Sequence, residues 1–137
     1  MDTIVALVAT AHYGFTIAAM SLTLGISVVA AVAAFLRPLE RRAIDAVINL
    51  NALAILAALL LGAVLLLGRG LDDPLHALYA VVALVAVPLA RILAVPAPST
   101  DPLAMAEARV IDRRAARWVF FASLVTLGVL VRLAMTG

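Results

Sequence analysis

The sequence predicts an all-α integral membrane protein, a four-transmembrane-helix bundle that runs up-down-up-down with both chain ends on the outer side. Of its 137 residues, 66% are hydrophobic and 13% are charged, whereas a soluble domain is about 45–50% apolar. The apolar residues form four long stretches separated by short segments rich in proline, glycine and charge. Four spans of about 20 residues with short connections use nearly the whole chain. A single membrane domain over residues 1–137 is therefore expected.

The first two spans are predicted over about residues 4–36 and 43–68. The first is longer than the ~20 residues that cross a hydrocarbon core, so it must tilt or protrude. Arg37 and Pro38 end this span, because a proline disfavours helical geometry at the residue before it. The second span ends where two glycines flank Arg69.

The last two spans are separated by the longest connection of the chain. The third span is expected over about residues 74–95, and Pro88 inside it predicts a kink. Prolines forbid a regular helix at the start of segment 96–116. The charged remainder of that segment is expected to form a helix at the cytoplasmic surface that can run straight into the fourth span. That span is predicted over about 117–136, and Trp118 marks its entry into the bilayer.

The arginines set the expected orientation. Seven lie around the connections after the first and third spans, two lie on the other side, and cytoplasmic loops carry the excess of positive charge. The seven are Arg37, Arg41, Arg42, Arg109, Arg113, Arg114 and Arg117. The chain is thus expected in the cell inner (cytoplasmic) membrane with extracytoplasmic termini.

The same arginines bear on the expected partners. Because most basic residues flank apolar spans, we expect contact with the lipid bilayer and no nucleic-acid partner. Anionic lipids are expected at Arg109, Arg113, Arg114 and Arg117. Other membrane subunits and a homo-oligomer remain open as partners.

Small and weakly polar residues recur at helical spacing and predict the faces that pack. Small side chains let membrane helices approach closely. The predicted inward stripes are His12, Thr16, Ala19, Thr23 and Ser27 in the first span, Asn51, Ala54, Ala58 and Gly62 in the second, and His76, Ala80, Ala83, Val87, Ala90 and Ala94 in the third.

The two histidines of the chain, His12 and His76, are the strongest candidates for a cofactor site. Both are expected near the outer face, on helices that lie diagonally across an up-down-up-down bundle, so their imidazoles could ligate one haem b. Tyr13 and Tyr79 could line the cofactor, and Thr16 and Ala80 lie one helical turn from the histidines. The alternatives are a metal or small-ligand site and no ligation at all.

A second group of polar residues is predicted near the cytoplasmic side. Asp45 and Asn49 share a helix face, and Arg91 lies near the inner end of the third span. An ion pair or hydrogen bond between these helices would fix their register, and a quinone, proton or anion pathway is the alternative.

Three functions remain open at this point. The first is a membrane-embedded b-type haem electron-transfer protein with two histidine ligands. The second is a non-catalytic accessory or assembly subunit of a larger membrane complex. The third is a small homodimeric transporter or channel. The absence of cysteine excludes thiolate metal sites and a cysteine nucleophile, and no motif for a catalytic residue is found, which leaves enzyme activity open.

Overall fold

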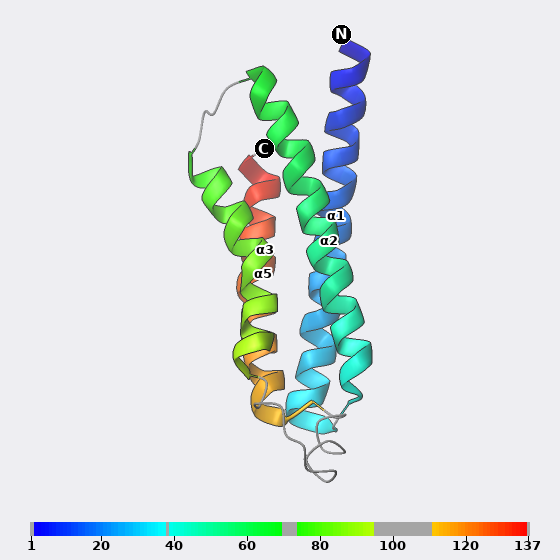
Figure 1. Cartoon of the computed structure of the whole chain (residues 1–137), viewed down its shortest axis with the longest axis vertical. Coiled ribbons are helices and arrows are strands. Elements are labelled where there is room, and N and C mark those ends of the chain that lie inside the picture. Colours follow the sequence, from blue (N-terminus) through cyan, green and yellow to red (C-terminus); the bar gives the residue numbers. More distant parts are fainter. Residues whose placement is uncertain (1, 38, 70–73, 95–110, 137) are drawn as a thin grey trace.

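The computed structural model describes residues 2–37, 39–69, 74–94 and 111–136, and it confirms an all-α four-helix bundle (Figure 1). The helices are α1 (Asp2–Ala31), continued by a π-helical turn η1 (Val32–Leu36), then α2 (Arg41–Arg69), α3 (Pro74–Ala94) and α5 (Arg113–Thr136). The predicted bounds of the first three spans agree within two residues at each end with α1 plus η1, with α2 and with α3. The last begins four residues before the predicted start of the fourth span.

The lengths and compositions of these helices are those of a membrane protein. Three stretches are long and apolar enough to cross a membrane, namely Thr3–Leu36, Arg41–Leu67 and Arg113–Met135. The apolar part of α3 is shorter, Ala77–Leu93. Outward-facing leucines, valines and isoleucines along all four helices are exposed, as expected where lipid rather than water surrounds a bundle.

The helices follow one another around the bundle as antiparallel neighbours (Figure 1). α1 packs against α2, α2 against α3, α3 against α5, and α5 back against α1. Within the described ranges, the diagonal pairs α1 with α3 and α2 with α5 do not contact each other. One end of the bundle holds the α1–α2 connection and the start of α5, and we call it the arginine-rich end because it carries Arg37, Arg41, Arg42, Arg113, Arg114 and Arg117.

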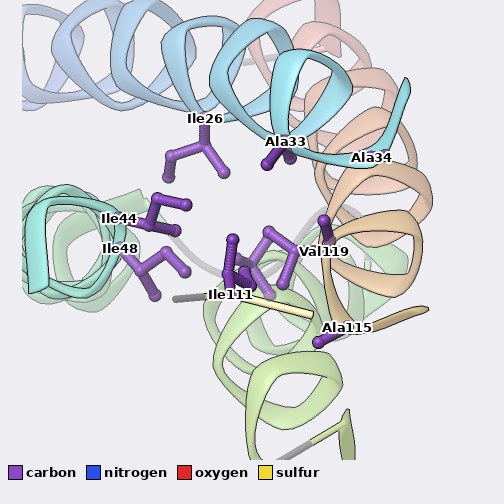
Figure 2. Close-up of a cluster of buried hydrophobic side chains, with 11 residues drawn as sticks. Ile26, Ala33, Ala34, Ile44, Ile48, Ile111, Ala115 and Val119 are labelled. Atoms are coloured by element: carbon purple, nitrogen blue, oxygen red, sulfur yellow. The ribbon is translucent and has the colours of Figure 1, made fainter. Parts of the chain in front are cut away.

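The core consists of two apolar clusters with a polar layer between them. The larger cluster lies at the arginine-rich end (Figure 2) and contains Ile26, Ala30, Ala33, Ala34, Ile44, Ile48, Val87, Ile111, Ala115, Ala116 and Val119. The second lies toward the chain termini and contains Ala19, Ala54, Ile55, Ala83 and Leu130. Buried polar side chains between them are Thr23, Ser27, Asn51, Ser123 and Thr126.

The connections at the arginine-rich end confirm one expectation and correct another. Arg37 leaves the helix in an extended conformation, with φ −145° and ψ 147°, as its position before a proline requires. The Ile111 amide donates to the Leu39 carbonyl at 3.1 Å, and Ile111 and Asp112 are not helical. The expected surface helix therefore does not run straight into α5, and the rest of its segment, residues 95–110, lies outside the described residues.

Pro88 lies inside α3, which remains helical on both sides of it. The helix bends part-way along its length in Figure 1. A proline removes one backbone hydrogen bond and crowds the carbonyl of the preceding turn, so a bend is its usual consequence.

Candidate functional site

His12 packs in the interface between α1 and α2, where its imidazole is held in one orientation. Nδ1 lies 2.7 Å from the Ala58 carbonyl oxygen. Because a carbonyl only accepts, Nδ1 donates its proton in this contact, and Nε2 is the nitrogen that carries the lone pair whenever the ring is neutral. This arrangement, a backbone carbonyl on one ring nitrogen, is how proteins orient a histidine that ligates a metal through the other.

Gly62 makes room for this ring. A Cβ atom at position 62 would lie 3.0 Å from His12 Cε1 and 3.4 Å from Nδ1. Real Cβ contacts are rarely that short, so a side chain here would force the imidazole to move. The predicted stripe of small residues on α2 therefore serves to seat His12 as well as to bring two helices together.

The Nε2 atom of His12 is not used in the contact with Ala58. In the part of the chain that the structure describes, no buried side-chain nitrogen or oxygen lacks a hydrogen-bond partner. Nε2 has no such partner among these residues, and the side chain is half-buried. The atom is therefore not completely buried by the described residues.

His76 lies in the first turn of α3, and its side chain is outside the described residues. Its depth can be compared with that of His12 from the Asp45–Arg91 contact, which joins α2 to α3. Ala58, the partner of His12, follows Asp45 by thirteen residues, or about 20 Å of helix. His76 precedes Arg91 by fifteen residues, or about 22 Å of helix. Measured along the helices, the two histidine positions therefore differ in depth by only a few ångströms.

The other predicted lining residues divide between the inside and the outside of the bundle. Thr16 is buried and its hydroxyl donates to the His12 carbonyl at 2.9 Å. Tyr79 and Ala80 on α3 are half-buried. Tyr13 is 61% exposed, because neighbouring residues of a helix point about 100° apart and His12 takes the inward position. The expectation that Tyr13 lines a site between the helices is thus corrected.

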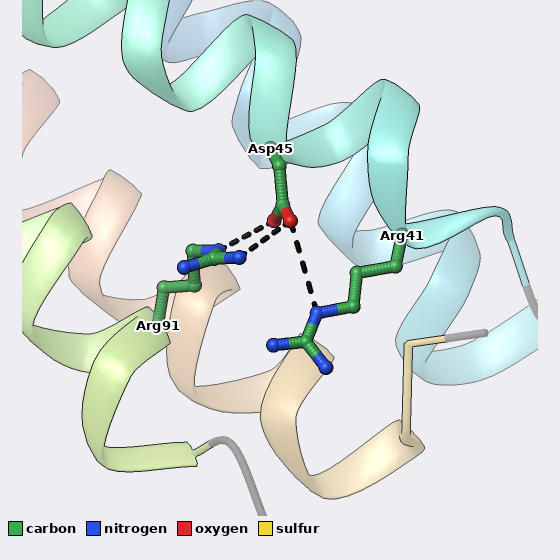
Figure 3. Close-up of polar contacts among 3 residues, drawn as sticks. All are labelled: Arg41, Asp45 and Arg91. Atoms are coloured by element: carbon green, nitrogen blue, oxygen red, sulfur yellow. Dashed lines mark hydrogen bonds and ion pairs between the residues drawn. The ribbon is translucent and has the colours of Figure 1, made fainter. Parts of the chain in front are cut away.

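The predicted pairing of Asp45 with Arg91 is present, and Arg41 joins it (Figure 3). The Arg91 guanidinium donates through Nε and Nη2 to the two Asp45 carboxylate oxygens. Arg41, one turn before Asp45 on the same helix, places its Nε 3.7 Å from Asp45 Oδ2. Asn49 is exposed and takes no part in this cluster. Its expected role there is corrected, because Asn49 lies about 40° further around α2 than Asp45 and points outward.

A polar layer at mid-depth links three helices. Thr23 Oγ1 lies 2.8 Å from the Ala19 carbonyl and 3.1 Å from Asn51 Oδ1, so its single proton serves two acceptors. Ser27 Oγ lies 2.8 Å from Ser123 Oγ on α5. These contacts tie α1 to α2 and α1 to α5 inside the apolar core.

Sequence reasoning missed the contribution of α5 to this layer. Ser123 and Thr126 are fully buried, and the Thr126 hydroxyl donates to its own helix at the Ala122 carbonyl. Their spacing of three residues, continuing the line of Ala116 and Val119, is the helical signal that could have revealed an inward face. Arg41 was also not predicted as a partner of Asp45, although the two are four residues apart.

No protein-family model matches the chain, and no curated protein or solved structure matches it either. Within the described ranges, no group of three or more His, Cys, Asp or Glu side chains is placed to hold a metal ion. The candidate site accordingly consists of His12 with its supports Ala58, Gly62 and Thr16, together with the His76 position across the bundle.

Proposed function

We propose that this chain is a membrane-embedded electron-transfer protein that binds one b-type haem between His12 and His76, near the outer face. The observation that carries the proposal is the His12 imidazole, fixed at Nδ1 by the Ala58 carbonyl with Nε2 not used in that contact. Haem iron takes neutral imidazole nitrogens as axial ligands. The similar depth of the two histidine positions, on helices diagonal to each other, supports the same assignment.

In this proposal the protein supplies orientation, and the bound haem supplies one-electron chemistry. Ala58 and Gly62 hold the His12 ring, and Thr16 is anchored to the same turn of α1 by its bond to the His12 carbonyl. Tyr79 and Ala80, half-buried on α3, would border the group on the opposite side.

The deciding experiment is an optical spectrum of protein purified from membranes of haem-replete cells, recorded oxidised and after reduction with dithionite. A Soret band with sharp α and β bands in the reduced state is expected. His12→Ala and His76→Ala should each abolish haem retention. Tyr13→Phe should retain the haem, because the Tyr13 side chain is exposed on the surface of the bundle. Circular dichroism of each variant distinguishes lost ligation from lost folding.

A colourless wild-type protein would overturn the haem assignment. The non-catalytic accessory or assembly subunit would then be the better interpretation, with its binding surface on the exposed apolar faces of the helices. Gentle detergent extraction that recovers stoichiometric partner proteins would identify that case.

We also propose the orientation in the inner membrane that the arginines indicate, with the arginine-rich end in the cytoplasm and both termini outside. Anionic lipid headgroups would gather around that end, at Arg113, Arg114 and Arg117. Arg109, a fourth expected contact, lies outside the described residues. Asp45 is paired with Arg91 on α3 and lies beside Arg41, which favours fixing the register of α2 and α3 over forming a transport path.

A further inference from the structure

The side of α5 that points away from the bundle carries a hollow near the arginine-rich end. It has a volume of about 230 Å³ and is lined by Arg114, Arg117, Trp118 and Phe121. These residues follow one another at intervals of three, one and three positions, so they share one face of the helix. The hollow is several times larger than the ~30 Å³ that one water molecule occupies in the liquid.

One of the two cations is held in place by aromatic rings. The Arg117 guanidinium carbon lies 5.9 Å from the centroid of the Phe35 ring, within the range of a cation–π contact. Phe35 meets Phe120 edge to face with centroids 6.0 Å apart, and Phe120 lies 5.4 Å from Phe121. Because Arg117 is already ordered, less conformational entropy is lost when an anion binds it.

The hollow has an apolar lining and is bordered by the two arginines, near one end of an apolar helix. Trp118 and Phe121 are 57% and 56% exposed, and they lie near the start of a stretch long enough to cross a membrane. Tryptophan is typical of the headgroup level. Within the described residues, neither Arg114 nor Arg117 forms an ion pair with a carboxylate, so both are available to an external anion.

We propose that this hollow and the two arginines that border it bind one anionic phospholipid from the surrounding bilayer. Arg114 and Arg117 hold the phosphate, because the paired N–H donors of a guanidinium match the spacing of two phosphate oxygens. The glycerol and the first acyl carbons lie against Trp118 and Phe121. The site is independent of haem binding.

The test uses Trp118, which is the only tryptophan of the chain. The protein is reconstituted in phosphatidylcholine vesicles containing equal mole fractions of brominated phosphatidylglycerol or brominated phosphatidylcholine, and quenching of Trp118 gives the relative affinity for the two lipids. Because the affinities for the two lipids are compared as a ratio, quenching of Trp118 by any other group in the protein affects both values equally and cancels. A clear preference for phosphatidylglycerol is expected, with each arginine contributing about fivefold.

The matched variants are Arg114→Gln/Arg117→Gln and Arg37→Gln/Arg42→Gln, which remove equal charge from the same end. The first should abolish the preference, and the second should retain most of it. Equal losses in both would show general electrostatic attraction and overturn the proposal, as would a wild type without preference. Displacement by inorganic phosphate would also overturn it, since it would identify a site for a free anion.

Discussion

At the residue scale, single polar side chains inside the apolar bundle each take a hydrogen-bond or ion-pair partner. His12 uses a backbone carbonyl of the next helix, and Asp45 binds one arginine of its own helix and one of α3. Unsatisfied polar groups are costly in lipid, so each of these contacts determines how two helices are aligned.

Replacing Gly62 by leucine should displace the His12 ring and destabilise the protein by about 1–3 kcal/mol, the usual cost of overpacking. The reason is that the first added carbon already lies 3.0 Å from His12 Cε1. Unfolding in mixed micelles of mild detergent and dodecyl sulfate measures the free energy. Gly25→Leu is the control, because a Cβ there meets nothing within 4 Å. Equal stability of the two variants would contradict the seating of His12 against Gly62.

Asp45→Ala should destabilise the bundle more than Arg91→Ala does. Removing the carboxylate leaves two arginines facing each other without a shared partner, whereas Arg91→Ala leaves Asp45 beside Arg41. A loss of about 1.5–3 kcal/mol is expected for Asp45→Ala, the range for hydrogen bonds to charged groups. The same unfolding assay compares the two variants, and Asn49→Ala, an exposed position, should have little effect. A larger loss for Arg91→Ala would show that Arg41 does not stabilise the carboxylate.

At the element scale, small residues and hydroxyls set how closely the helices pack. Hydroxyl groups on α1 and α5 bond mainly to carbonyls of their own helices, as Ser27 does to the Thr23 carbonyl at 2.9 Å and Ser123 to the Phe120 carbonyl at 2.8 Å. The two serine hydroxyls also lie 2.8 Å from each other. Together they have only two protons, which are shared among three hydrogen-bonding contacts. Each hydroxyl can therefore lose its partner on the other helix and still be satisfied.

A double-mutant cycle with Ser27→Ala and Ser123→Ala should consequently give a small coupling energy. About 0.6 kcal/mol is the average for such bonds between membrane helices. The free energy of unfolding of the wild type, both single variants and the double variant supplies the value. A coupling well above about 2 kcal/mol would mean that the interhelical bond dominates over the bonds within each helix.

At the scale of the whole molecule, charge and length are distributed unevenly between the two ends. Six described arginines gather around the α1–α2 connection and the first turns of α5, while α1 and α2 extend beyond the other two helices toward the opposite end (Figure 1). From this uneven charge the positive-inside rule predicts that the arginine-rich end lies in the cytoplasm.

Cysteine labelling tests that orientation cleanly, because the natural chain has no cysteine. In intact cells, a membrane-impermeant maleimide should label Thr3→Cys and Met135→Cys, which are exposed near the two chain ends. Arg42→Cys, exposed at the arginine-rich end, should be labelled only after the membrane is permeabilised. The reverse pattern would place both termini in the cytoplasm.

The sequence alone determined the four helices, their approximate ends and most of their inward faces. Hydropathy, proline positions and helical spacing are local properties, so Arg37 before Pro38 ends a span and Thr16 and Ala19 turn inward whatever the partner helix is. Local reasoning failed at Ile111 and Asp112, where Ile111 pairs with Leu39 instead of continuing a helix into α5.

Only the tertiary structure decided which partner each polar residue takes. Asn49 was expected beside Asp45 and is exposed, whereas Asn51 is buried against Thr23. Two residues of separation turn a side chain by about 200° around a helix, so the two asparagines lie on opposite faces of α2 and only one of them can face the bundle. The partner of His12 could not be foreseen either, because a backbone carbonyl carries no sequence signal. Which carbonyl it meets is fixed by the rotation and depth of α2 against α1.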